Sequence, residues 1–113
     1  MIKVFQSKIT NEEVHSFLGD PFKDMIKFVV DLEKERVAFG GELHADAEAL
    51  LLERGSSQAD LWGGNLYPSN PKGNQIEFTA LINIRPSAGN NSMEVKDDGT
   101  KIKMRAILDK ILP

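Results

Sequence analysis

The sequence predicts one α+β domain, residues 1–113, in which a mostly antiparallel sheet of three to five strands carries helices on one face. Two observations favour this class. Segments with apolar residues at every second position occur together with segments whose apolar residues recur every three or four positions. Short connections rich in Gly, Pro and Asn separate them. The expected order is strand, helix, helix, three strands, a further short strand, and a helix.

The first forty residues predict a strand followed by two helices. Residues 1–5 alternate apolar and polar side chains, as a short strand does. Thr10 is a candidate N-cap for a helix that ends at Gly19, because Glu13 stands three residues later and completes a capping box. A longer helix is expected over residues 21–39, because apolar residues recur there at three- and four-residue steps.

Residues 42–53 admit two interpretations. Strict alternation of apolar and polar residues favours a strand with His44, Asp46 and Glu48 on one face. The high content of Ala and Leu favours a helix, in which His44 and Glu48 share a face and Asp46 points elsewhere. Because no Ser, Thr, Asp or Asn stands where such a helix would need its cap, we predict the strand.

The second half of the chain predicts three further strands and a terminal helix. Residues 61–67 form the expected partner strand, in which Gly63 and Gly64 indicate a bulge or a close backbone approach. Residues 75–85 show the most regular alternation of the chain, and residues 93–95 are a short last strand. The final helix is expected to present an apolar stripe to the core. Its members are Met104, Ile107, Leu108 and Ile111.

Composition excludes several classes of function. The chain has 113 residues and no cysteine, which excludes thiol nucleophiles, thiolate metal sites and disulfides. The net charge is −3 with both signs intermixed, so a nucleic-acid partner is not expected. No apolar run approaches the roughly 20 residues of a membrane-spanning helix, and the first residues are too polar for a signal peptide. These features predict a soluble, cytoplasmic protein of bacterial type without a membrane partner.

A polar face of the predicted sheet is the candidate site. It would comprise His44, Asp46, Glu48, Asn65, Asn83 and Arg85. On a strand, residues two apart lie roughly 6.5 Å apart on one face. The first three side chains could therefore hold a divalent metal ion as cofactor, with a histidine and carboxylates as ligands. Arg85 would bind an anionic group, because it is permanently charged. An ordinary solvated face with a cross-strand ion pair is the structural alternative.

Two functional hypotheses follow from this site. In the first, the chain binds a metal or a small anion, and hydrolysis is the reaction such a site would support. Whether it is an enzyme stays open, since no phosphate-loop, nucleophile-elbow or zinc-protease motif occurs. In the second, it is a non-catalytic homodimer or partner-binding module whose interface includes Trp62.

Four short motifs carry a resemblance to a known family. They are H-A-D-A-E, L-W-G-x-N-x-Y-P, I-N-I-R-P and N-x-S-M. In these motifs, over about residues 25–112, the chain resembles a family of short bacterial and archaeal proteins of unknown function. The resemblance implies no activity and no catalytic residue.

Overall fold

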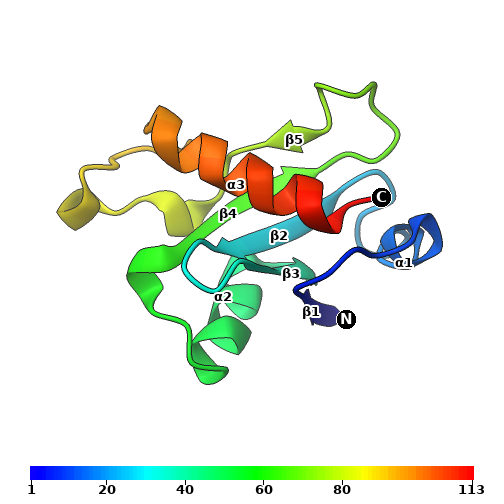
Figure 1. Cartoon of the computed structure of the whole chain (residues 1–113), viewed down its shortest axis with the longest axis horizontal. Helices are drawn as coiled ribbons and strands as arrows, with labels where there is room; N and C mark the ends of the chain where they lie inside the picture. The colour runs from blue at the N-terminus through cyan, green and yellow to red at the C-terminus, as the bar shows by residue number, and fades with distance from the viewer.

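A computed structural model describes all 113 residues and arranges five strands in one antiparallel sheet (Figure 1). The strands are β1 (Ile2–Phe5), β2 (Ile26–Asp31), β3 (Arg36–Gly40), β4 (Leu61–Leu66) and β5 (Ile76–Glu77). The helices are α1 (Asn11–His15), α2 (His44–Glu53) and α3 (Asp98–Ile111), and short 3₁₀ turns are η1 (Gln58–Asp60), η2 (Leu81–Asn83) and η3 (Pro86–Ala88). The strand order across the sheet is β1-β3-β2-β4-β5. The predicted α+β class and antiparallel sheet are confirmed.

The helix predicted over residues 21–39 is wrong, because this segment forms the β2–β3 hairpin at the centre of the sheet. Phe28 and Val30 are buried in the core on one face of β2, and Val29 is buried in the core on the other. A strand covered on both faces is apolar at successive positions, so its spacing imitates that of a helix. Glu35, in the left-handed backbone conformation with φ of 50°, completes the turn.

The strand predicted over residues 42–53 is also wrong, because residues 44–53 form helix α2. Its buried residues are His44, Ala47 and Leu51, which recur at the spacing of one helical face. The apparent alternation arises because Ala45 and Ala49, which are apolar, lie on the exposed side. High helix propensity therefore outweighs the missing cap: Leu43 at the N-cap position makes no side-chain capping bond.

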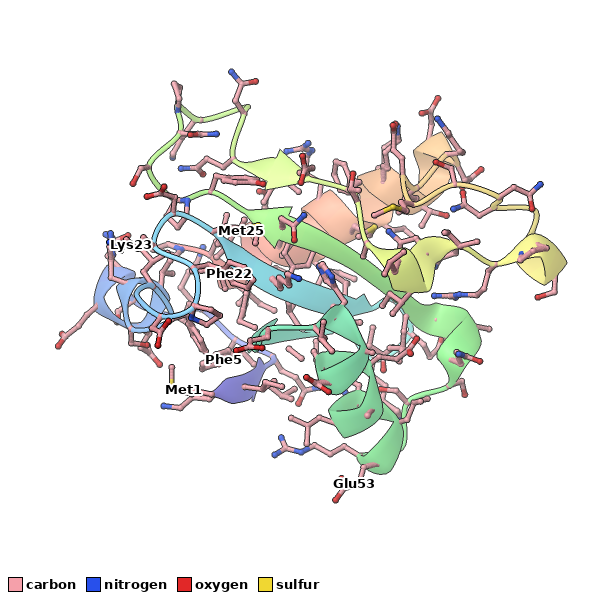
Figure 2. The ribbon with its side chains drawn as sticks, turned by 180° about the vertical axis from the view of Figure 1, so that it is seen from behind. Met1, Phe5, Phe22, Lys23, Met25 and Glu53 are labelled. Atoms are coloured by element: carbon pink, nitrogen blue, oxygen red, sulfur yellow. The ribbon has the colours of Figure 1, made fainter.

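The helices cover both faces of the sheet, which corrects the expectation of helices on one face. Helix α3 crosses the front of the sheet in Figure 1, and Figure 2, the view from behind, shows α2 in front of it with Glu53 at its far end. Each face has its own core. The α3 side buries, among others, Phe28, Phe39, Trp62, Met104 and Ile111. The α2 side buries Val29, Ala38, Ala47, Leu51 and Leu61.

Strand β4 is confirmed where residues 61–67 predicted a strand, but it pairs with β2 and β5 rather than with residues 42–53. The predicted close approach at its two glycines is present. A Cβ atom on Gly63 would lie 2.8 Å from Cβ of Ala80 and 3.2 Å from Cδ2 of His44. One on Gly64 would lie 2.5 Å from Cζ of Phe28. Gly63 thus lets α2 and the chain after β5 lie directly against β4, and Gly64 makes room for the Phe28 ring.

The long strand predicted over residues 75–85 is shorter than expected, because only Ile76–Glu77 is strand and irregular backbone with the turn η2 follows. The side chain of Asn83 explains the change. Its Oδ1 accepts from the Gly63 N–H at 2.8 Å, and its Nδ2 donates to the carbonyls of Gly63 at 2.9 Å and Met93 at 3.0 Å. A side-chain amide therefore takes the place of a neighbouring strand. In place of a strand at residues 93–95 there is a single bridge between Thr79 and Glu94.

The first predicted helix is present but ends at His15 rather than at Gly19, and the last predicted helix is confirmed. Thr10 and Glu13 form the capping box of α1, and Asp97 caps α3 by accepting from the Thr100 N–H at 2.8 Å. The predicted apolar stripe of α3 is buried in full. The segment before α1 is fastened to the end of α3, because the N–H of Ile9 donates to the carbonyl of Ile111 at 2.8 Å. None of the helices combines the length and the apolar character that a membrane span requires.

A buried carboxylate fastens the β2–β3 turn to the end of α2. Asp31 is fully buried, and its Oδ1 accepts from the backbone N–H groups of Glu33 and Lys34 at 3.0 and 2.9 Å. Its Oδ2 accepts from the hydroxyl of Ser56 and lies 3.7 Å from Nε of Arg36. The Arg36 guanidinium also donates to Ser56 Oγ at 2.9 Å, so the three side chains form one network.

Candidate functional site

The predicted metal site of His44, Asp46 and Glu48 on one strand face does not form, because residues 44–48 are helical. His44 is buried at the first turn of α2, Asp46 is exposed, and Glu48 lies one turn further on and is half-buried. Oε2 of Glu48 is buried without a hydrogen-bond partner. No group of three or more His, Asp or Glu side chains is placed to hold a metal ion. The strand geometry on which the metal prediction depended is therefore absent.

Arg85 serves the packing of the chain over β4. Its guanidinium lies 4.3 Å from the centroid of the Trp62 ring and donates to the carbonyls of Gln58 at 3.0 Å, Ile82 at 3.3 Å and Leu61. Burial lowers the pKa of Arg85, and the charge of Glu48 acts in the opposite direction. Each nitrogen of the Arg85 guanidinium donates to a backbone carbonyl, so the group is held against the chain and not presented to an anion as the sequence suggested. Trp62 is only 8% exposed, so it belongs to the core and not to an exposed interface.

Asn83, fully buried against Gly63, is likewise occupied by backbone groups. Asn90, which the sequence did not single out, has the same kind of role. Its Nδ2 donates to the carbonyls of Asn83, Ser92 and Glu94, and its Oδ1 accepts from the N–H of Lys96. These two asparagines hold the irregular chain after β5 in shape.

Two of the predicted residues, His44 and Asn65, line one cavity of about 410 Å³. It lies between the first turn of α2, the ends of β2 and β4, and the segment around η2. Exposed or half-buried apolar side chains make up much of its lining. They are Met25, Leu43, Leu81, Ile82 and Met93. Its size falls in the range of about 300–1,000 Å³ typical of small-molecule sites, which also combine an apolar lining with a few polar groups.

The ring of His44 is held with one nitrogen bound and the other free. Nε2 lies 2.8 Å from the carbonyl oxygen of Gly64, and because a carbonyl can only accept, Nε2 carries the proton. The Cδ2 edge of the ring faces Gly63, so Nδ1 lies on the opposite edge, away from β4. Nδ1 makes no hydrogen bond within the chain and is not one of the buried polar atoms without a partner. It is therefore not fully buried, and because His44 lines the cavity, the lone pair of Nδ1 is available there as an acceptor.

A polar row across three strands lies next to this ring. In the register of the sheet Lys27 is opposite Asn65, and Asn65 is opposite Glu77. Nδ2 of Asn65 donates to Oε1 of Glu77 at 2.7 Å, whereas Oδ1 of Asn65 is buried without a partner. Lys27 forms no ion pair within 4 Å, and its Nζ lies 5.0 Å from the centroid of the Phe22 ring. The sheet thus has a polar row, of which Asn65 was predicted and Lys27 and Glu77 were not.

Burial lowers the pKa of His44 below its usual 6.5; the Gly64 carbonyl and Asn65 oppose this shift, and the charge of Lys27 adds to it. The unfolded chain therefore binds a proton on His44 at a higher pH than the folded chain. The free energy of unfolding is therefore expected to fall as the pH decreases below about 6.5. The contribution of this one group is at most about 1.4 kcal/mol per pH unit.

This expectation can be checked by urea unfolding between pH 5 and 8. His44→Gln should reduce the slope of unfolding free energy against pH, whereas His15→Gln, at an exposed position of α1, serves as the matched control. An unchanged slope in the His44 variant would contradict a buried neutral imidazole.

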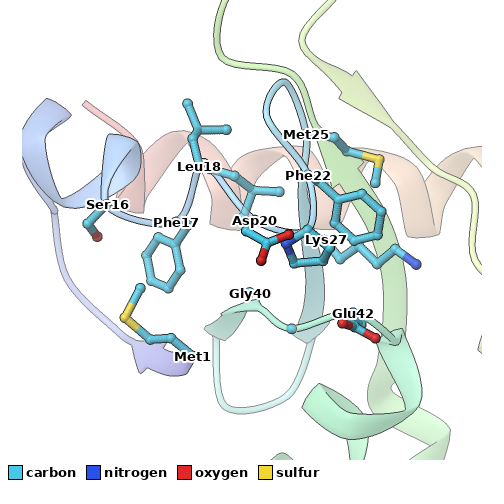
Figure 3. Close-up of a pocket in the computed structure, with 13 residues that line it drawn as sticks. Met1, Ser16, Phe17, Leu18, Asp20, Phe22, Met25, Lys27, Gly40 and Glu42 are labelled. Carbon is cyan, nitrogen blue, oxygen red and sulfur yellow. The ribbon is translucent and has the colours of Figure 1, made fainter.

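A second cavity of about 330 Å³ adjoins the first, and the two share Met25 and Lys27 (Figure 3). Figure 3 shows Lys27, Phe22 and Met25 along one wall, with Glu42 below them. The polar side chains of this cavity other than Lys27 are exposed, and none is held with a free atom directed into a buried space. The His44 cavity is therefore the stronger candidate site.

The sequence did not indicate the other members of the His44 site. Lys27 lies in a segment predicted to be a helix, and Leu81 and Met93 come from segments predicted to be strands. The one useful local signal was the Gly63-Gly64 pair, because the absence of a side chain at Gly63 admits the His44 ring.

A family model described as a protein of unknown function (DUF5674) matches residues 3–111. Neither the curated proteins nor the solved structures contain a match to the chain.

Proposed function

The chain belongs to the DUF5674 family, and from this premise we propose that it binds an organic small molecule in the His44 cavity. The apolar part of the ligand lies against Leu43, Leu81 and Met93, and a hydroxyl or N–H group of the ligand donates to Nδ1 of His44. The observation that carries the proposal is the His44 ring, which lines the cavity and is held by the Gly64 carbonyl through one nitrogen.

Binding fits this histidine better than proton transfer does. A catalytic histidine is usually oriented by a carboxylate, which stabilises the imidazolium that forms during the reaction. Here the orienting group is a neutral carbonyl, and burial lowers the pKa of the ring. The ring therefore stays neutral and accepts a hydrogen bond without taking the proton. In this proposal the metal that the sequence suggested has no role.

Methyl 3-hydroxyoctanoate, a neutral probe with one hydroxyl donor and an alkyl chain, tests the proposal. In NMR titrations of the labelled protein, we expect shifts at the amides of Leu43, Thr79 and Leu81 and at the ring of His44. His44→Phe and the rim variant Leu81→Ser should each weaken binding, and His15→Phe should not. Because Leu81 is 69% exposed, its variant should fold normally. No shifts at these positions, or shifts that survive both variants, would refute the proposal.

Self-association is the second candidate, favoured by the apolar side chains around the cavity mouth. Leu81, Leu43 and Met93 are 69%, 57% and 41% exposed. Clustered apolar exposure of this kind marks protein interfaces as well as ligand sites. Light scattering decides between them: a dimer that Leu81→Ser dissociates would support self-association, and a monomer at all concentrations would exclude it.

A further inference from the structure

We infer that the ligand of the His44 cavity is an amphipathic carboxylate whose anionic group lies between Lys27 and the first turn of α2. The inference rests on the proposed function and adds the chemical class of the ligand. Two independent features of the cavity wall point to it, one a side chain and one the backbone.

The first feature is the charge of the cavity. Lys27 is the one formally charged side chain among the eleven that line it, because the His44 ring is neutral. Lys27 is half-buried and lies over the Phe22 ring. The nearby acids are Asp20 and Glu42 in the neighbouring cavity and Glu77 in the same row of the sheet, and none comes within 4 Å of its ammonium group. A half-buried cation without a counter-ion favours an anionic ligand.

The second feature is the open first turn of α2, a helix of ten residues. Its N-cap residue, Leu43, supplies no side-chain bond, and the N–H groups of His44 and Ala45 have no acceptor in the chain. Leu43, His44 and Ala45 all line the cavity. Unbound N–H groups and the positive end of the helix dipole attract an anion at such a position.

The free nitrogen of His44 limits which anion fits. His44 is 9% exposed, and its Nδ1 offers a lone pair, which repels a bare carboxylate and requires a donor. The ligand must therefore present its carboxylate to Lys27 and the helix turn, and a separate hydroxyl or N–H group to His44. The apolar rim then receives an alkyl or aryl body. A hydroxy acid with a hydrocarbon chain has all three groups.

Three probes separate these contributions: 3-hydroxyoctanoate, its methyl ester, and octanoate. We expect the hydroxy acid to bind about tenfold tighter than its ester, because a charge-assisted bond to Lys27 replaces a neutral contact. Octanoate, which lacks the donor for His44, should bind more weakly than the hydroxy acid. Raising the salt concentration should weaken binding of the acid but leave that of the ester unchanged.

Variants of Lys27 then test the assignment of the anionic group. Lys27→Met should remove most of the preference for the hydroxy acid over the ester, and the unbound N–H groups of the first turn of α2 account for the part that remains. Lys27→Arg should retain most of the preference. Lys23→Met, at an exposed lysine of the preceding loop, is the matched control.

The outcomes distinguish this inference from the proposal on which it rests. Equal affinity for acid and ester, or an acid preference that is undiminished in Lys27→Met, would overturn the placement of the carboxylate while the ligand site stands. If acid and ester both fail to shift the amides of Leu43, Thr79 and Leu81, the proposed function itself is wrong. If the acid shifts the amides of Phe17 and Gly40 instead, it occupies the neighbouring cavity, and the inference is wrong as well.

Discussion

Asp31→Ala is expected to lower the free energy of unfolding by about 3–5 kcal/mol, the range found when one partner of a buried ion pair is removed. Asp31 is fully buried and accepts hydrogen bonds from two backbone N–H groups of the hairpin turn and from Ser56. Its loss leaves these donors without an acceptor and the buried Nε of Arg36 without its counter-charge. A domain of this size has a total stability of about 5–15 kcal/mol, so the variant should be near the limit of folding.

Urea unfolding followed by circular dichroism measures this effect. Glu33→Ala, in the same turn but exposed, is the matched control and should change stability by less than about 0.5 kcal/mol. The double variant Asp31→Leu with Arg36→Met should recover part of the loss, because it removes the second buried charge together with the first. Equal stability of Asp31→Ala and Glu33→Ala would show that the network contributes nothing.

Asn83→Ala should have the second largest effect, about 3–5 kcal/mol of destabilisation. The substitution leaves the N–H and carbonyl of Gly63 without partners in a buried place, at about 1–3 kcal/mol for each unsatisfied group. It also removes one of the two donors to the Met93 carbonyl, which keeps the N–H of Ala80. Asn83→Asp should be comparable, because a carboxylate would face two carbonyl oxygens. The exposed Asn91→Ala is the control.

Hydrogen exchange gives a local readout for Asn83. The amide of Gly63 should exchange much faster in Asn83→Ala than in the parent protein, because its only acceptor is the side chain of Asn83. If the Gly63 amide is equally protected in the variant and in the parent protein, the side chain of Asn83 does not act as a strand partner.

The sequence predicted the fold class, both capped helices and the close approach at Gly63 and Gly64 because these depend on local signals. It failed for β2 because burial on two faces hides alternation, and for α2 because alternating alanines lie on its exposed side. These errors have one cause: apolar spacing reports which positions are apolar, but not how many neighbours cover the segment.

The candidate site could be predicted only in part. His44 and Asn65 do line one cavity, but they were predicted as members of a polar strand face that does not exist. Arg85 and Asn83 were chosen for their chemistry, and the structure uses that chemistry for backbone carbonyls and N–H groups. Lys27 was missed because its position depends on the register between β2 and β4, which only tertiary structure sets.

The two cores of the sheet differ in how much of the chain each requires. The five buried members of the α2 side lie between residues 29 and 61, whereas the α3 side needs Ile111, whose carbonyl also binds Ile9. Contacts between residues close in sequence form with the smaller loss of chain entropy. On a ribosome, the β2–β3–α2–β4 unit can therefore begin to assemble while α3 is still being synthesised. Until then the apolar face that α3 will cover stays open, and a chain stalled at that stage presents the largest surface for aggregation.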